Sequence, residues 1–253
     1  MKAIPQTKLA ALEGGAVEYA LAGTGPAIVL LNGAGGPIEG WFRVFAGLIE
    51  LGTVLAYNRA GIGRSAKPAL AQTGSEVVAT LRALLAALAL RPPYVLVGHS
   101  MGGLHANLFA RLYPEDVASV VLLEASAPED IALMEGGKTR TQRVVERVLD
   151  MMFGKDQHGE PAQAANTAAE LAASGPFPHV PLVVVTGGRP AMGWVTPRPL
   201  LEGRAANQRA LARLSPLGHQ VIAARSGHFP QFSEPAVMIA AVRAVVSERG
   251  PGS

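Results

Sequence analysis

Short, continuous apolar runs recur along this chain, and they constrain its fold more than any other feature. The first is the stretch Ala-Ile-Val-Leu-Leu at residues 27–31, which is typical of a β-strand buried on both faces. Further runs of this kind lie at residues 53–57, 94–97, 119–123, 182–185 and 220–223. Segments with helical spacing of apolar residues separate most of them, at residues 40–50, 75–90, 101–113, 198–214 and 235–248. This alternation predicts an α/β fold with a mostly parallel, doubly wound sheet.

Two more candidate strands precede these runs. Residues 8–12 and 17–22 are separated by Gly14 and Gly15, and the second segment alternates apolar and polar side chains. Such alternation is typical of a half-exposed antiparallel strand. We therefore expect a hairpin at one edge of the sheet.

The interval between residues 124 and 181 breaks the alternation, because it is too long for a simple crossover between neighbouring strands. Helical spacing of apolar residues appears at 139–153, and an Ala-rich segment follows at 162–173. We expect a single domain whose core is formed by residues 1–125 and 181–253. Residues 126–180 are expected to form a short helical cap over a binding site.

Composition excludes several classes of function. Apolar residues make up 49% of the chain and charged residues 16%, which favours a compact globular protein over a disordered one. The net charge is +3, but the Lys and Arg residues are scattered, so no nucleic-acid partner is expected. With no cysteine, the chain has no disulfide, no thiolate metal site and no Cys nucleophile.

Neither a membrane span nor an export signal is expected. The longest apolar stretch, residues 81–90, falls far short of the roughly 20 residues that a membrane-spanning helix needs. Polar residues from Gln6 to Lys8 interrupt any apolar run near the N-terminus. We therefore expect a soluble, cytoplasmic protein, and nothing in the sequence calls for a cofactor or a metal.

The segment Gly98-His99-Ser100-Met101-Gly102 matches the pattern G-x-S-x-G. It follows a buried strand directly and precedes a helical segment, which is the context in which this pattern places a nucleophilic serine on a sharp turn. The glycines permit the turn, and the start of the helix favours developing negative charge. Ser100 is therefore the candidate nucleophile.

A serine hydroxyl needs a neighbouring base to become a strong nucleophile. Of the six histidines, His228 is the best candidate, because it follows the last buried strand and would face the same edge of the sheet as Ser100. His99 and His105 are expected to orient or line the site. The remaining histidines, His158, His179 and His219, are expected to lie at the surface or in packing positions.

Several segments in the same order resemble the α/β-hydrolase superfamily over nearly the full chain. Residues 32–36, Asn-Gly-Ala-Gly-Gly, are similar to the family's His-Gly loop, residues 57–65 resemble its Tyr-Asp-x-x-Gly-x-Gly-x-Ser segment, and residues 226–228 resemble its catalytic histidine loop. The resemblance implies an eight-stranded type of sheet. It also implies that the backbone N–H groups of Ala34 and Met101 form an oxyanion hole. Asn32 stands where the family usually has a histidine.

The third member of a catalytic triad departs from the family's commonest pattern, in which an Asp follows the penultimate strand. The corresponding loop, residues 186–192, contains no carboxylate. Glu124 is our choice instead, because it ends the strand next after that of the nucleophile, as in some family members, and a carboxylate there is costly unless it is paired. Glu129 and Asp130 are the alternatives in the same loop.

Several nearby residues have both a structural and a functional interpretation. Arg59 and Arg64 are expected to hold their loop together rather than bind an anionic group. Trp41 and Phe42 are expected to pack the first helix rather than line the pocket. Four residues of the insertion are either core or an apolar acyl pocket: Met134, Met151, Met152 and Phe153.

These residues together predict a serine hydrolase that cleaves an ester, lactone or similar small, mainly apolar acyl substrate through an acyl-enzyme on Ser100. Two alternatives remain open. The same triad supports perhydrolase, amidase or lyase chemistry, and members of the superfamily also serve as non-catalytic binding proteins or receptors. The sequence gives no indication of the oligomeric state.

Overall fold

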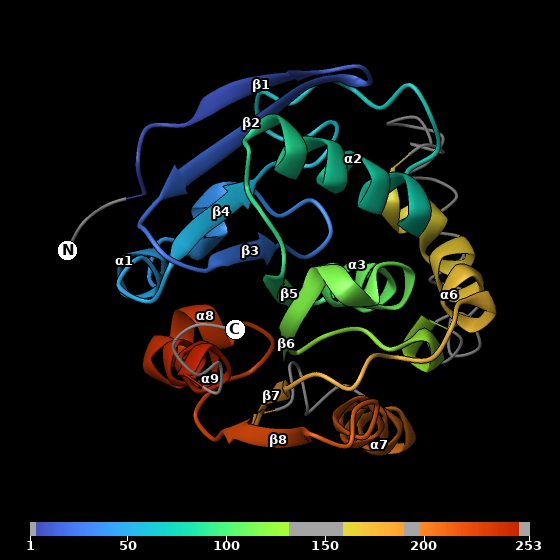
Figure 1. Ribbon diagram of the computed structural model, residues 1–253. Coiled ribbons are helices and arrows are strands. Elements are labelled where there is room, and N and C mark those ends of the chain that lie inside the picture. The colour runs from blue at the N-terminus through green and yellow to red at the C-terminus, as the bar shows by residue number, and fades with distance from the viewer. Residues whose placement is uncertain (1–3, 132–158, 190–197, 248–253) are drawn as a thin grey trace.

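The computed structural model describes residues 4–131, 159–189 and 198–247 (Figure 1). In these parts of the chain, eight strands form one sheet in the order β1-β2-β4-β3-β5-β6-β7-β8. The strands are β1 (Lys8–Leu12), β2 (Gly15–Ala22), β3 (Ala27–Leu31), β4 (Thr53–Tyr57), β5 (Tyr94–His99), β6 (Val117–Leu123), β7 (Leu182–Gly187) and β8 (Gly218–Ala223). The predicted fold class, a mostly parallel α/β sheet, is confirmed.

The direction of the strands changes near one edge. β1 and β2 form an antiparallel hairpin, and β2 also runs antiparallel to β4. From β4 to β8, every neighbouring pair is parallel. The predicted hairpin is therefore confirmed, and the carboxyl ends of the central strands share one edge of the sheet.

Helices cover both faces of the sheet, as Figure 1 shows. One face carries α2 (Gly74–Ala87), α3 (Met101–Leu112), α6 (Ala164–Ala173) and α7 (Arg198–Ala212). The other carries α1 (Phe45–Leu48), α9 (Pro235–Ser247), and the short segments η1 (Ile38–Trp41) and α8 (Pro230–Ser233). Each face has its own apolar core against the sheet, because the parallel strands bury side chains in both directions.

Local sequence explains where α2 begins. Thr73 precedes the helix with extended backbone, and its hydroxyl accepts a hydrogen bond from the backbone N–H of Glu76. Val77, Val78, Leu81, Leu84 and Leu85 then recur at helical spacing and are buried. A capped start and one apolar face therefore fix this helix against the sheet.

The predicted helix over residues 40–50 is wrong. The structure has the 3-10 turn η1 and the four-residue α1 in its place. Gly40 and Gly47 weaken a continuous helix, although the buried Trp41 and Phe45 keep a helix-like spacing. Trp41 packs in the core as expected, whereas Phe42 is 49% exposed and does not.

Residues 126–131 and 159–180 of the expected cap insertion fall within the described residues. In the second of these stretches, η3 (Glu160–Gln163) leads into α6, which matches the helix expected at residues 162–173 and packs against α2 and α3. The helix expected at 139–153, with Met151, Met152 and Phe153, lies outside the described residues, as does Met134. The division into core and cap stays a prediction. Among the described helices, none is long and apolar enough to cross a membrane.

Candidate active site

Ser100 occupies a sharp turn between β5 and α3. Its backbone has φ 51° and ψ −122°, a region that residues other than glycine rarely adopt. Gly102 lies so close to the preceding loop that a Cβ atom there would clash with the backbone carbonyl oxygens of Leu31 and Asn32. Gly102 of the G-x-S-x-G motif is therefore required by the close packing of the start of α3 against the end of β3. This packing places Ser100 at the edge of the sheet.

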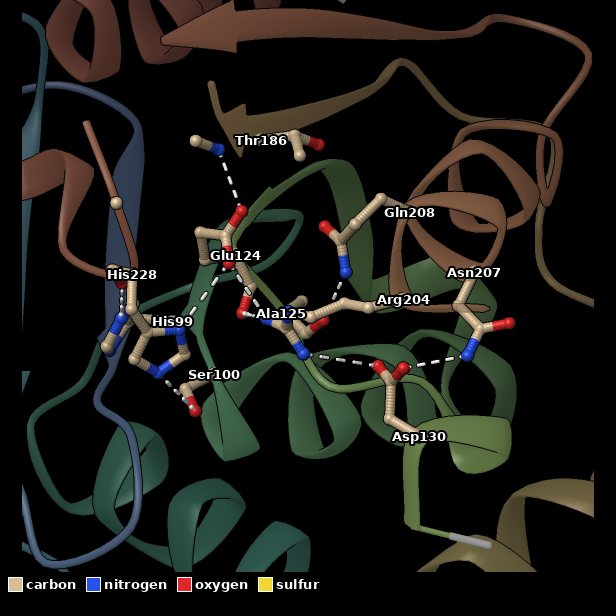
Figure 2. A network of polar contacts seen from close by, with 12 residues as sticks. His99, Ser100, Glu124, Ala125, Asp130, Thr186, Arg204, Asn207, Gln208 and His228 are labelled. Carbon is tan, nitrogen blue, oxygen red and sulfur yellow. Dashed lines mark hydrogen bonds and ion pairs between the residues drawn. The ribbon is translucent and has the colours of Figure 1, made fainter. Parts of the chain in front are cut away.

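His228 lies beside Ser100, although the two residues are far apart in the sequence. The loop after β8 brings the Nε2 atom of His228 to 3.1 Å from the Oγ atom of Ser100 (Figure 2). With a proton on Nδ1, Nε2 is free to accept the serine proton. This is the geometry that general-base activation of a hydroxyl requires.

Glu124 lies on the other side of the His228 ring. Its Oε2 atom is 3.5 Å from Nδ1 of His228, and it ends the strand next to that of Ser100. Of the two alternative acids, Glu129 is exposed, and Asp130 instead accepts hydrogen bonds from the backbone N–H of Ala127 and the side chain of Asn207. Among the three candidate carboxylates, Glu124 is therefore the one that faces His228.

Several donors keep Glu124 ionised. Burial alone would raise the pKa of this carboxyl, but His228, Arg204 and the backbone N–H of Gly187 together hold its pKa below the usual value. Gly187 donates to Oε1 at 2.7 Å and Arg204 to Oε2 at 2.9 Å. The loop after β7, which has no carboxylate of its own in its described part, thus contributes a backbone donor to the acid.

Arg204 was missed by sequence reasoning. It lies on the first half of α7, after a segment outside the described residues, and no motif surrounds it. The only available signal is that Arg204, Asn207 and Gln208 share one face of a predicted helix. That face turns out to contact the loop that follows Glu124.

The loop at residues 32–36 lies directly beside the elbow. A Cβ atom on Gly33 would be 3.1 Å from the His99 ring and 3.2 Å from Cβ of Ser100. Asn32, which replaces the expected histidine, is buried and donates from its side chain to the carbonyl oxygen of Pro37 across the loop. The amide therefore closes this loop internally.

Each of the two predicted oxyanion donors shares a peptide unit with a carbonyl group that already accepts hydrogen bonds. The Gly33 carbonyl, in the same peptide unit as the Ala34 N–H, accepts hydrogen bonds from Arg59 and Gly36. The Ser100 carbonyl, in the same unit as the Met101 N–H, accepts from the backbone of Gly103 and Ser126. Because the C=O and N–H of a trans peptide point in opposite directions, both N–H groups point away from these partners. Ala34 is exposed, and Met101 directly follows Ser100 at the start of α3. Their role as oxyanion donors stays a prediction.

His99 orients the site rather than lining it. Its ring is buried, and Nε2 lies 2.8 Å from the carbonyl oxygen of His228, to which it donates. Burial lowers the pKa of His99 to about 4, so the ring is neutral near pH 7. His99 thereby fixes the backbone of the loop that carries His228.

The other histidines lie away from this cluster. His105 is fully buried in α3, and neither ring nitrogen has a hydrogen-bond partner among the described residues. His179 and His219 are exposed, as expected, and His158 lies outside the described residues. Within the described part of the chain, no three His, Asp or Glu side chains come together in a group that could hold a metal ion.

The two arginines of the loop after β4 have structural contacts, as expected. Arg59 is buried, donates to the carbonyl oxygens of Asn32 and Gly33, and forms an ion pair with the buried Glu160 of η3. Arg64 pairs with Glu18 on β2 at 2.8 Å. Arg59 therefore ties the loop at residues 32–36 to the segment that leads into α6.

Comparisons with known proteins identify the family of this fold. A family model described as the alpha/beta hydrolase fold matches residues 26–213. An uncharacterized protein of Mycobacterium tuberculosis is 32% identical over 138 residues, which are 54% of this chain but only 37% of that relative. The match thus spans well under half of the relative's length.

Solved structures resemble nearly the whole chain. The enol-lactonase from Burkholderia xenovorans LB400 is 22% identical, with a TM-score of 0.68 over 95% of this chain and 100% of the lactonase. A serine hydrolase involved in carbazole degradation is 20% identical, with a TM-score of 0.66 over 96% of this chain and 99% of that enzyme. At these identities the likeness shows a shared fold.

Proposed function

Because this chain belongs to the alpha/beta hydrolase fold family, we propose that it is a serine hydrolase that cleaves an ester, lactone or similar small acyl substrate through an acyl-enzyme on Ser100. One observation carries the proposal. The His228 ring lies between Ser100 and Glu124, with 3.1 Å from Nε2 to the serine Oγ and 3.5 Å from Nδ1 to the carboxylate. A hydroxyl, a base and an acid in line are what acyl transfer by a serine needs.

In the first half of the proposed reaction, Oγ of Ser100 attacks the carbonyl carbon of the substrate while Nε2 of His228 takes the hydroxyl proton. The carbonyl oxygen becomes an oxyanion, which the backbone N–H groups of Ala34 and Met101 stabilise. Glu124 stabilises the imidazolium that forms. The carbon–oxygen bond to the leaving group then breaks, and His228 returns its proton to the departing oxygen.

In the second half, water replaces the leaving group. His228 takes a proton from the water as it attacks the acyl carbon, and the bond to Ser100 breaks while His228 returns a proton to Oγ. The products are a carboxylic acid and free enzyme. With a lactone, both the acid and the alcohol remain in one product molecule.

Two features favour a small, mainly apolar acyl substrate. The sequence between residues 126 and 180, proposed as the cap and the seat of specificity, supplies apolar Met and Phe side chains. One protein of like fold is named as an enol-lactonase, which makes lactones a rational first group to assay. Short p-nitrophenyl esters are the second, because they report acyl transfer to Ser100 directly.

The test is the Ser100→Ala variant. Turnover of short esters and lactones should fall by about 10⁴-fold or more, because removal of a triad nucleophile eliminates the acyl-enzyme route. A fluorophosphonate probe should label the wild type on Ser100 and leave the variant unlabelled. Ser75→Ala, at an exposed position at the start of α2, is the matched control and should keep both activity and labelling.

Two results would contradict the proposal. Full activity in Ser100→Ala would remove the serine from the mechanism. A wild-type protein that neither turns over any acyl substrate nor accepts the probe would instead favour a non-catalytic binding protein. A wild type that is labelled but turns over amides or peroxide-dependent substrates alone would keep the nucleophile and change the reaction class.

A further inference from the structure

We propose that Arg204 of α7 is a positioning residue for the catalytic acid, holding Glu124 in the orientation and charge state that His228 requires. The inference rests on the proposed function, because it assigns a role within the same triad. It is carried by the contacts that Arg204 makes with Glu124 and by the way in which α7 holds the surrounding loop (Figure 2).

Arg204 contacts Glu124 at two places. The Nη2 atom of Arg204 donates to Oε2 of the Glu124 carboxylate at 2.9 Å and to the backbone carbonyl oxygen of Glu124 at 3.0 Å. The side chain of Arg204 is 33% exposed, whereas that of Glu124 is 9% exposed. A guanidinium thus lies over a carboxylate that is nearly withdrawn from water, where such a pairing is stronger than at the surface.

One face of α7 contacts the loop after β6 at several of its residues between 124 and 130. Arg204 also approaches Asp130 at 3.5 Å, and Asn207 donates to the same carboxylate at 2.7 Å. Gln208 donates to the carbonyl oxygen of Ala125 at 2.6 Å. Residues three and four apart on a helix lie on one face, so these side chains act together on the loop at residues 124–130.

The backbone of Glu124 needs this support. Its φ is 42°, in the left-handed region that costs a residue with a side chain about 1 kcal/mol or more. Arg204 binds the carbonyl oxygen of this residue, while the N–H of Glu124 donates to Val185 on β7. Contacts on both sides therefore hold the turn that aims the carboxylate at His228.

Oε2 of Glu124 is shared between two cations in the working enzyme. Arg204 is 2.9 Å away and Nδ1 of His228 is 3.5 Å away, so the guanidinium makes the closer contact. The arginine helps to keep the carboxylate ionised, because it lowers the pKa of Glu124. Arg204 therefore sets where the acid lies and the charge that it presents to His228.

Charged and titratable groups approach this cluster from several elements. They are His99 on β5, Asp130 in the loop after β6, Arg204 on α7 and His228 in the loop after β8. Burial lowers the pKa of His99 to about 4, so it stays neutral over the pH range of the assay. Asp130 lies on the far side of Arg204 from His228 and faces the arginine rather than the imidazole (Figure 2).

The experiment compares the pH profiles of kcat and kcat/KM for the wild type, Arg204→Gln and Arg204→Lys. In Arg204→Gln, kcat should fall by about 10- to 100-fold with KM nearly unchanged, because the acid is less well positioned. The acid side of the kcat/KM profile should move to higher pH, because the pKa of Glu124 rises when the guanidinium that lowers it is removed. Arg204→Lys keeps a charge, so its acid side should stay near the wild type while kcat falls several-fold.

Arg209→Met is the matched control, because it removes an exposed positive charge from the same helix. Its kinetics should equal those of the wild type. Unchanged kcat and an unchanged profile in a folded Arg204→Gln would overturn the proposal. If that variant does not fold by circular dichroism, Arg204→Lys decides alone, and wild-type kcat in it would overturn the proposal.

A second readout separates this inference from the proposed function. NMR titration of the Glu124 carboxyl group in the Ser100→Ala protein, with and without Arg204→Gln, requires no turnover. The midpoint should rise on removal of the guanidinium, which lowers the pKa of Glu124. A rise without any ester activity would retain the Arg204 contact and reject the hydrolase, whereas an unchanged midpoint in an active enzyme would reject the role of Arg204 alone.

Discussion

Glu124 illustrates how one side chain can hold a site together. It ends β6 with left-handed backbone, accepts from Gly187 and Arg204, and faces Nδ1 of His228. A neutral isostere at this position would keep the volume but lose the negative charge. The charge is what stabilises imidazolium and keeps the proton on Nδ1.

Glu124→Gln should therefore lower kcat by about 10²- to 10⁴-fold, with a smaller effect on KM. Steady-state kinetics on a short ester measure this directly. Glu129→Gln is the matched control, because Glu129 lies in the same loop but is exposed, and it should retain full activity. If Glu129→Gln costs as much as Glu124→Gln, or if Glu124→Gln costs nothing, Glu124 is not the acid.

At this scale, the sequence indicated which residues the fold would bring together. Ser100 and Glu124 directly follow β5 and β6, and His228 lies in the loop after β8, and parallel strands bring such positions to one edge of the sheet. Arg204 could not be found in this way. Its contact with Glu124 depends on where α7 packs against the loop after β6, which no periodicity in the sequence encodes.

Between elements, the pair of Arg59 and Glu160 connects the loop at residues 32–36 to η3. Both side chains are buried, and Arg59 also binds two carbonyl oxygens of that loop. Burial alone would raise the pKa of Glu160, but Arg59 holds it below the usual value. The carboxylate is therefore charged in the fold and depends mainly on Arg59.

Arg59→Met should lower the free energy of unfolding by about 3–5 kcal/mol, because it leaves the buried charge of Glu160 uncompensated. Urea denaturation followed by circular dichroism measures the change. Arg64→Met provides the comparison, because the side chain of Arg64 is 55% exposed and its loss should cost about 1 kcal/mol or less. Equal losses in the two variants would mean that Glu160 does not rely on Arg59.

Elements differed in how well the sequence predicted them. The buried strands β3 and β4 were predicted to the residue, because both runs have clear ends: Pro26 and Asn32 flank β3, and Gly52 and Asn58 flank β4. The helix at 40–50 was wrongly predicted, because Trp41, Phe45 and Leu48 repeat at helical spacing while belonging to two separate short elements, η1 and α1. The spacing indicates which side of the segment faces the core, but it does not show that one helix continues through residues 42–44.

On the scale of the whole molecule, two buried histidines link folding to pH. His99 on β5 and His105 on α3 are both buried, and burial lowers the pKa of each to about 4. In the unfolded chain a histidine has a pKa near 6.5. Below pH 6.5 the unfolded state therefore takes up protons that the folded state excludes, and the native state loses stability.

The free energy of unfolding should accordingly be constant above pH 6.5 and decrease as the pH falls from 6.5 to about 4, by about 1.4 kcal/mol per pH unit for each of the two histidines. His105→Leu should remove about half of that slope. The variant should also be at least as stable as the wild type at pH 7, because among the described residues neither ring nitrogen of His105 has a partner whose loss would carry a cost. Urea titrations at half-unit steps between pH 4 and 8 measure both quantities. A flat wild-type profile, or a slope that His105→Leu leaves intact, would show that the fold does not exclude these protons.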